Sequence, residues 1–341
     1  MEIPVETKLP ISKLASIFKN TTASYKYFWF LSILNFVEKG ETIIFKEDLF
    51  LSMLTNAWHP ICNHNLSFGK SDIIGNKINS INNQLNIQSN ISTDRLKEIL
   101  SENINSSEIA FLNKNVPFKF LSPWYGSIPE KEIENLSQNF QENVPYALFK
   151  HKIVINPKWI LYLSHNNKIL REFCYWNLSS FLQTRNPSVP NVSMKLFPET
   201  NRNALNKQRN EFWKLTFDEL GSINCIFTGN NLTIKENNFA IDHFIPYSFV
   251  THDLIWNLLP IDKTFNSIKS NKIPDFSNHF ENFCRLQNTA FEIYKNKNPD
   301  GKYLEEYITI FKHENFDKRK LKETIEPLTM IALNNGFSPL A

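Results

Sequence analysis

The spacing of apolar residues predicts a mainly helical N-terminal part of the chain. From Tyr27 to Val37, apolar side chains recur at steps of three and four residues, and Gly40 follows as a C-terminal stop. The same spacing recurs in three further segments, 48–58, 92–102 and 157–184. The polar, asparagine-rich stretch 67–90 predicts loops or short helices, whereas partial alternation over 146–155 predicts a strand or a hairpin.

A proline-rich segment then interrupts the helical pattern. Residues 186–200 contain three prolines and no helical period, which is typical of an extended connector. We therefore place a domain boundary there, between a helical domain over 1–185 and a second domain over 201–341. The second domain is expected to open with a short helix near 202–215.

Short strands and turn residues replace the helical spacing in the second domain. The stretch 224–232 predicts a strand that ends in a turn at Gly229, and 239–245 predicts a second strand. After an irregular loop, Asp262 is placed to cap a helix that runs to about Asn271. The predicted order is strand, strand, helix.

Apolar residues at helical steps over 276–290 predict further helices, which are expected to pack against this unit. The fold class is therefore α+β, mainly α. It consists of a helical N-terminal domain followed by a C-terminal ββα unit with extra helices. No repeat at the period of a solenoid protein is present in the sequence.

Composition and charge narrow the class of protein. The chain is 42% hydrophobic with 29 phenylalanines, enough for a real core, and a net charge of +3 is compatible with nucleic acid but not strongly basic. The apolar run Tyr27–Val37 is shorter than the roughly 20 residues of a membrane span, and no signal-peptide cleavage pattern precedes it. The four cysteines form no CxxC pair, which favours a reducing compartment. We expect a soluble, cytoplasmic protein with no membrane partner.

The residues that carry chemistry lie at the end of the second predicted strand of this domain. Hydrolysis of a phosphodiester needs a deprotonated water, a held phosphate and a neutralised leaving oxygen. Asp242 and His243 supply a carboxylate and a base, although both reach one site only if the strand is distorted there, because consecutive strand residues face opposite sides. Asn266, on the following helix, offers a carbonyl oxygen. These oxygen ligands, completed by water and phosphate, suit Mg²⁺ or Mn²⁺.

This stretch resembles the HNH endonucleases, most closely the HNH domain of the type II CRISPR effector nucleases. The resemblance rests on a Cys-x-x-Thr-Gly turn at 225–229 and on Ile-Asp-His-x-Ile-Pro-x-Ser at 241–248. It also rests on two asparagines, since Asn257 follows His243 by 14 residues and Asn266 follows Asn257 by 9. No RuvC-like pattern or arginine-rich guide-binding helix accompanies the motif, so we expect a stand-alone HNH protein.

The resemblance implies a ββα-metal nuclease and a role for each matching residue. His243 is then the general base, and Asp242 and Asn266 are the ligands of a Mg²⁺ or Mn²⁺ ion. Asn257 braces the loop by hydrogen bonds so that the histidine is correctly aimed. The three motif positions are His243, Asn257 and Asn266, so the last position is an asparagine where the family name has a histidine. The family accommodates this variation, because asparagine can replace histidine as the last metal ligand.

Other candidate metal ligands have simpler interpretations. Cys225 is read as a buried packing residue, because Thr228 stands where the second cysteine of a zinc-binding pair would be, so no structural zinc is expected. His59, Cys62 and His64 are read as hydrogen-bonded residues near a helix end rather than as a metal site.

Three lysines on or near the predicted metal-site helix are weak candidates for nucleic-acid contacts. Lys263, Lys269 and Lys272 are placed to touch phosphates, but a charged helix face is as often simply solvated. The sequence leaves these two readings equally open.

Three functions fit the sequence. The first is a metal-dependent DNA endonuclease, by analogy a restriction or phage-defence effector, with residues 1–185 as a targeting or regulatory domain. The second is a catalytically inactive nucleic-acid-binding or regulatory module. The third is an intracellular toxin-type nuclease controlled by a partner. The complete set of four motif residues favours the first function, and either a regulatory protein partner or a homo-oligomer is compatible with it.

Overall fold

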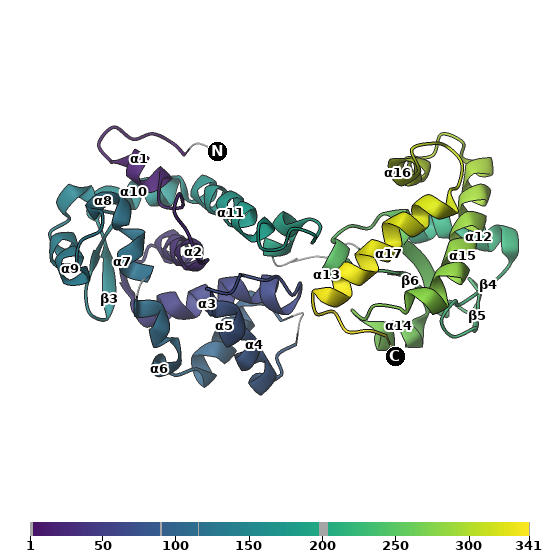
Figure 1. Ribbon diagram of the computed structural model, residues 1–341, viewed down its shortest axis with the longest axis horizontal. Coiled ribbons are helices and arrows are strands. Elements are labelled where there is room, and N and C mark those ends of the chain that lie inside the picture. Colours follow the sequence, from purple (N-terminus) through teal and green to yellow (C-terminus); the bar gives the residue numbers. More distant parts are fainter. Residues whose placement is uncertain (1–2, 89–90, 115, 198–203, 341) are drawn as a thin grey trace. The chain divides into compact units, whose positions relative to one another are not determined.

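The computed structural model describes residues 3–88, 91–114, 116–197 and 204–340. It divides the chain into two compact units, each described by itself below (Figure 1). The first unit contains Met1–Pro187 and Val192–Pro198, and the second contains Ser188–Asn191 and Glu199–Ala341.

The first unit consists of helices and one small antiparallel sheet. Its helices are α1 (Ile11–Ala15), α2 (Tyr25–Glu38), α3 (Lys46–Cys62), α4 (Ile74–Leu85), α5 (Thr93–Asn103), α6 (Ser106–Ile109), η1 (Ala110–Lys114), α7 (Val116–Phe120), α8 (Ser122–Tyr125), α9 (Glu130–Gln138), η2 (Gln141–Asn143), α10 (Pro157–His165), α11 (Asn167–Gln183) and η3 (Val192–Leu196). Its strands are β1 (Ile43–Phe45), β2 (Tyr146–Leu148) and β3 (Lys152–Ile155), in the order β1-β3-β2.

Helix α2 forms the centre of the first unit. It is apolar around most of its circumference, and such a helix is stable only when other elements cover every side. Helices α3, α7, α10 and α11 all pack against it. The indole of Trp29 donates to the Tyr146 hydroxyl at 3.0 Å, and that hydroxyl donates to the Pro117 carbonyl at 2.7 Å, so the polar atoms of these two buried aromatic side chains are satisfied.

The helices predicted for the first unit are confirmed, and so is the hairpin at 146–155, which forms β2 and β3. Strand β1 had not been predicted, because three residues are too few to show an alternating pattern. The expectation of an extended connector is wrong over Val192–Leu196, which form η3 and bury Leu196. Residues 198–200 of that predicted connector lie outside the described residues.

The second unit combines short strands with a larger number of helices, which confirms the predicted α+β, mainly α class. Its elements are η4 (Gln208–Trp213), α12 (Lys214–Leu220), β4 (Ile223–Asn224), β5 (Asn231–Leu232), β6 (Phe239–His243), α13 (Tyr247–Val250), η5 (Ile255–Asn257), β7 (Leu258–Asp262), α14 (Lys263–Lys269), α15 (Phe276–Lys297), α16 (Lys302–Phe311) and α17 (Lys318–Asn334). The predicted opening helix corresponds to η4 and α12; residues 202–203 lie outside the described part.

Strands β6 and β7 form the antiparallel hairpin that leads into α14. The pairing runs from Phe239 opposite Asp262 to His243 opposite Leu258 without interruption. The expectation of a distorted strand at residues 242–243 is therefore wrong, because the ladder contains no bulge there. The expected irregular loop before Asp262 is present only over residues 251–254, because Leu258–Asp262 form β7. The stretch 224–232 instead forms a separate pair, β4 with β5.

A proline explains why β7 was missed in the sequence. Proline lacks the N–H that a strand ladder uses, so Pro260 argues against a central strand. The backbone N–H of Phe244 donates to Asn257, and that of Lys263 donates to Asn238. Because hydrogen-bonded pairs alternate along an antiparallel ladder, Pro260 falls at a non-hydrogen-bonded position opposite Ile241. The strand therefore loses no bond to β6.

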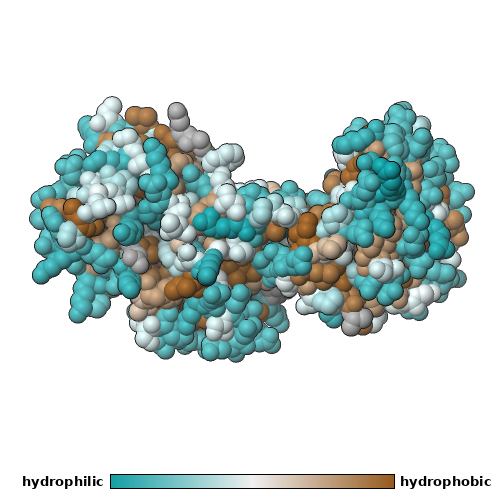
Figure 2. Space-filling view, in the orientation of Figure 1, coloured by the Kyte–Doolittle hydropathy of each residue, from teal (hydrophilic) through white to brown (hydrophobic). Residues whose placement is uncertain are grey.

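Aromatic packing joins the hairpin to the long helix α15. The rings of Phe244 and Phe283 stack with centroids 4.3 Å apart, and both side chains are fully buried. Figure 2 shows hydrophilic residues over most of the visible surface, with apolar residues in smaller patches. Within the described parts of the chain, every helix is too short or too polar to cross a membrane.

Candidate active site

Asp242 and His243, the predicted metal ligand and general base, lie at the end of β6. His243 is fully buried, and its Nδ1 lies 3.8 Å from Asp242 Oδ1. This separation exceeds hydrogen-bond length. The side chains approach each other although the strand is regular.

The other ring nitrogen of His243 is held by the loop that follows α13. His243 Nε2 lies 2.9 Å from Asp253 Oδ1 and 3.2 Å from the carbonyl oxygen of His252. Both neighbours are oxygens that accept hydrogen bonds, so we assign the ring proton to Nε2. In that tautomer Nδ1 carries the basic lone pair and faces Asp242.

The sequence analysis did not identify Asp253. Its carboxylate comes from an irregular loop, ten residues after His243, where no periodicity marks which side chains point inward. The available signal was chemical: a base on a strand is commonly oriented by a carboxylate on its second nitrogen. Asp253 is one of several carboxylates near the motif, so the fold was needed to select it.

Asn257 fixes the backbone just beyond His243. Its side chain is fully buried, donates through Nδ2 to the Ile245 carbonyl at 2.9 Å and accepts through Oδ1 from the Ile245 N–H at 2.9 Å. The Phe244 N–H also donates to the Asn257 carbonyl at 2.7 Å. These three bonds attach the end of β6 to the start of β7.

Helices α15 and α16 support the same loop from behind. Gln287 donates to the Leu258 carbonyl at 2.6 Å and receives a hydrogen bond from the Tyr307 hydroxyl. Glu306 accepts from the Ile255 N–H at 2.5 Å. Because Gln287 and Tyr307 are fully buried, this network holds the segment before β7 in one position.

Asp242 makes a short ion pair with the last residue of α14. Lys269 Nζ lies 2.7 Å from Asp242 Oδ2; the Lys269 side chain is fully buried, whereas that of Asp242 is 20% exposed. Burial acts to raise the pKa of the Asp242 carboxyl, but the neighbouring His243 ring and Lys269 ammonium outweigh it and lower that pKa to about 2. The carboxyl group is therefore ionised at neutral pH.

Asn266 lies one turn before Lys269 on the same helix. Residues three apart on a helix are neighbours on one face, so Asn266 belongs to the side of α14 that meets Asp242. Its side chain is half-buried. The helix is fixed at its start by Asp262, which accepts from the Phe265 N–H at 3.0 Å, as predicted for a cap.

The three candidate phosphate-binding lysines have different environments. Lys263 is exposed and Lys272 is half-buried, and within the described residues neither takes part in an ion pair. The prediction that Lys269 lies at the surface with Lys263 and Lys272 is wrong. Lys269 faces β6 and is fully buried against Asp242, so it presents no cation at the surface.

The family model described as HNH endonuclease matches residues 225–275. This segment is an HNH endonuclease domain. The matched segment contains all four motif residues and confirms the resemblance to the HNH family that the sequence indicated. Comparisons with curated proteins and with solved structures gave no match.

Membership of this family indicates the general activity of the domain. HNH endonucleases are hydrolases that cleave nucleic acid and generally use a divalent metal ion, so the chain carries a nuclease domain with a nucleic-acid substrate. The matched segment is confined to the second unit of the structure.

The residues at the site fit a hard divalent ion. Asp242 offers an ionised, partly exposed carboxylate, and Asn266, on α14, carries an amide oxygen of the kind that such an ion accepts. Among the described residues, no three or more His, Cys, Asp or Glu side chains converge on one point. Magnesium does not require such a cluster, since it keeps several waters and often binds one or two protein oxygens together with substrate phosphate.

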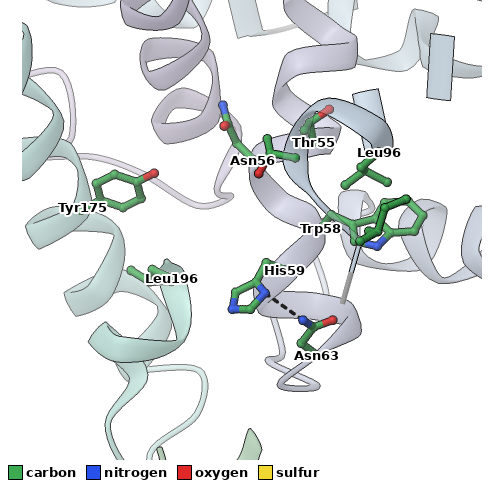
Figure 3. Close-up of a pocket in the computed structure, with 10 residues that line it drawn as sticks. Thr55, Asn56, Trp58, His59, Asn63, Leu96, Tyr175 and Leu196 are labelled. Atoms are coloured by element: carbon green, nitrogen blue, oxygen red, sulfur yellow. Dashed lines mark hydrogen bonds between the residues drawn. The ribbon is translucent and has the colours of Figure 1, made fainter. Parts of the chain in front are cut away.

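The first unit contains a separate pocket, of about 100 Å³, which Figure 3 shows. Helix α3 lines it with Thr55, Asn56, Trp58 and His59, and α11 contributes Tyr175. His59 Nδ1 lies 2.9 Å from the Asn63 amide nitrogen, the dashed line in Figure 3.

A pair of histidines lies beside this pocket. His59 Nε2 lies 3.1 Å from His64 Nε2, so a hydrogen bond joins the two rings. Burial lowers the pKa of His59 to about 4, which keeps its ring neutral at physiological pH. The hydrogen bonds of His59 to Asn63 and His64 match the reading of these residues as hydrogen-bonded groups near a helix end.

Proposed function

We propose that the HNH domain is a metal-dependent DNA endonuclease in which His243 is the general base and Asp242 and Asn266 hold Mg²⁺ or Mn²⁺. The observation that carries the proposal is the position of the His243 ring between the carboxylates of Asp253 and Asp242. With Nε2 bound by Asp253 and the His252 carbonyl, the basic Nδ1 faces the ionised Asp242 carboxylate. A base and a metal ligand are thereby juxtaposed.

In the proposed reaction, His243 Nδ1 takes a proton from water as the water oxygen bonds to phosphorus. The bond from phosphorus to the leaving oxygen breaks, and that oxygen is protonated from solvent. Asp253 stabilises the imidazolium that forms, because its carboxylate accepts a hydrogen bond from Nε2–H throughout. The divalent ion, when bound, neutralises the negative charge that develops on the leaving oxygen.

Asn257 has a positioning role in this proposal. Its side chain binds the backbone of Ile245, and its carbonyl accepts from the Phe244 N–H, so its effect on the reaction is through the aim of His243. The full burial of His243 adds a requirement. Groups that cover the ring must move before a phosphate and a water reach Nδ1.

The first unit is proposed to restrict the nuclease. A nuclease domain in the cytoplasm endangers host DNA unless sequence recognition, a trigger, a protein partner or self-association limits it. The first unit has its own core and its own pocket and lies outside the matched segment, which supports a targeting or regulatory role. Restriction or phage defence is the biological role that we propose.

The test is incubation of the purified full-length protein with plasmid and linear DNA in Mg²⁺, Mn²⁺ or EDTA. We expect cleavage with either metal and none with EDTA. His243→Ala should lower the rate by a factor of about 10²–10⁴, as loss of a general base does. His313→Ala, which removes an exposed histidine outside the matched segment, is the matched control and should cleave normally.

Cleavage by folded His243→Ala at more than about a tenth of the wild-type rate would refute the role of this residue. DNA binding without cleavage under all metal conditions would support the alternative of an inactive nucleic-acid-binding module. Cleavage that appears only after a partner protein is removed would support the toxin-type alternative.

A further inference from the structure

The ammonium group of Lys269 lies directly on the proposed metal ligand. Lys269 Nζ binds Asp242 Oδ2 at 2.7 Å, and the lysine side chain is fully buried. Within the described residues, Asp242 is the one carboxylate at ion-pair distance from this ammonium. A buried ammonium without an anionic partner is strongly unfavourable, so Lys269 depends on this pair.

The other carboxylate of the site does not relieve this dependence. Asp253 directs its Oδ1 to His243 Nε2, on the opposite side of the imidazole ring from Asp242. Lys263 and Lys272, the other lysines of this region, make no ion pair within the described residues. The charges of Asp242 and Lys269 therefore balance each other.

We propose that Lys269 competes with the divalent metal ion for Asp242, so that the HNH domain binds the metal weakly until a DNA phosphate enters the site. The inference rests on the proposed function, in which Asp242 is a metal ligand. A divalent ion that approaches Asp242 is repelled by the ammonium at short range, in a partly buried site where charges are poorly screened. The ammonium also weakens the carboxylate as a ligand, because a cation bound to Oδ2 lowers its basicity.

A DNA phosphate offsets the repulsion between the Lys269 ammonium and the metal ion. It brings negative charge to the exposed side of Asp242, where the ammonium and the carboxylate otherwise cancel. Metal and DNA then bind with positive coupling, and each raises the affinity for the other by the same factor. Lys269 is in this view a positioning residue that makes occupation of the metal site depend on the substrate.

Binding of Mn²⁺ to the full-length protein tests the inference without any cleavage. Electron paramagnetic resonance measures the free Mn²⁺ as protein is added. Lys269→Met replaces the ammonium by an uncharged chain of similar length, and we expect it to bind Mn²⁺ about tenfold more tightly than the wild type in the absence of DNA. Lys269→Gln, which keeps a hydrogen-bond donor against Asp242, is expected to behave in the same way.

Lys272→Met is the matched control. It removes one positive charge just beyond α14, from a half-buried lysine that makes no ion pair within the described residues. Its Mn²⁺ affinity should stay within about twofold of the wild type, because screening weakens the more distant charge. Circular dichroism and thermal midpoints verify that each variant is folded.

A second arm measures the coupling in the His243→Ala background, which is expected not to cut. A short DNA duplex should raise the Mn²⁺ affinity of H243A severalfold and leave that of H243A/K269M nearly unchanged. If DNA changes the Mn²⁺ affinity of H243A and of H243A/K269M by the same factor, the coupling through Lys269 is overturned.

Unchanged or weaker Mn²⁺ affinity in the folded Lys269 variants would overturn the competition, as would a complete lack of Mn²⁺ binding to every chain. If Lys269→Met does not fold, the Mn²⁺ affinity of Lys269→Gln tests the competition. Tightened Mn²⁺ binding in a protein that never cleaves DNA would instead support the competition and refute the endonuclease proposal, so the two failures are distinguishable.

Discussion

Asn257 binds Ile245 at both of its backbone groups, with 2.9 Å from Nδ2 to the Ile245 carbonyl and 2.9 Å from the Ile245 N–H to Oδ1. The Asn257 side chain thus makes the two hydrogen bonds that a neighbouring strand would otherwise make to the backbone just beyond β6. Because the side chain is fully buried, water cannot substitute for either bond. The geometry matches the bracing role that the sequence motif implied.

Asn257→Ala is therefore expected to destabilise the HNH domain by about 2–4 kcal/mol, since it leaves one buried N–H and one buried carbonyl unpaired. Denaturant unfolding of the full-length protein measures this loss. Asn282→Ala, at an exposed position on α15, is the control and should change stability by less than about 0.5 kcal/mol. A loss below about 1 kcal/mol for Asn257→Ala would mean that the loop finds other partners.

Asp253→Asn should lower the rate of DNA cleavage by about 10- to 100-fold with little change in stability. The substituted amide retains the shape of the carboxylate but no longer offsets the positive charge that His243 gains during proton transfer. The measurement is a single-turnover rate with saturating Mg²⁺. A rate within about threefold of the wild type would show that the His252 carbonyl alone orients the ring.

Protonation of His59 should make the first unit less stable in mild acid. Burial depresses its pKa from 6.5 to about 4 in the folded chain, so the unfolded chain binds this proton more readily. The stabilising effect of the neutral ring is complete above pH 6.5 and is lost as the pH falls toward 4. The loss is on the order of 2 kcal/mol.

Unfolding of the first unit at pH 7 and pH 4.5 measures this effect. His59→Gln, which does not titrate, should flatten the pH dependence, whereas His165→Gln, at an exposed position, should not. An unaltered pH dependence in folded His59→Gln would assign the acid sensitivity to other groups.

The boundaries of the second unit make a specific prediction about fragments. Ser188–Asn191 belong to this unit, and Asn191 donates from its side chain to the Val250 carbonyl at 2.9 Å. A fragment over 188–341 should therefore be more stable than one over 204–341 by about 1 kcal/mol or more. If the first unit supplies control rather than chemistry, the longer fragment should cleave DNA with altered specificity or regulation.

Circular dichroism first establishes that each fragment is folded, and cleavage of the same substrates is then compared with that of the full-length protein. A folded fragment that is inert, and that regains cleavage when residues 1–187 are added in trans, would show that the first unit completes the active site.

The sequence predicted the helices and the second strand of the site because these carry repeated local signals. The apolar spacing of α15 and the cap at Asp262 are visible in the order of residues alone. Strand β7 was missed because Pro260 opposes strand assignment, and only the pairing with β6 shows that its missing N–H is tolerated.

The partners of the motif residues depended on contacts across the fold. Asp253 comes from an irregular loop, and Lys269 looked like a surface lysine because the sequence does not reveal which side of a short helix faces β6. Side chains that meet only through tertiary packing leave no local pattern. The motif thus marked Asp242 and His243, which the structure places 3.8 Å apart, but not the ion pair between Asp242 and Lys269.

The position of Pro260 also determines whether the β6–β7 hairpin can be extended. Non-hydrogen-bonded positions of a ladder direct their backbone groups away from the partner strand, so Leu258 and Pro260 face the outer side of β7. The outward carbonyl of Leu258 is occupied by Gln287, and Pro260 has no proton to offer. A strand from another chain would therefore find no regular ladder along this edge. Self-association of the protein by addition of a strand is therefore blocked along β7.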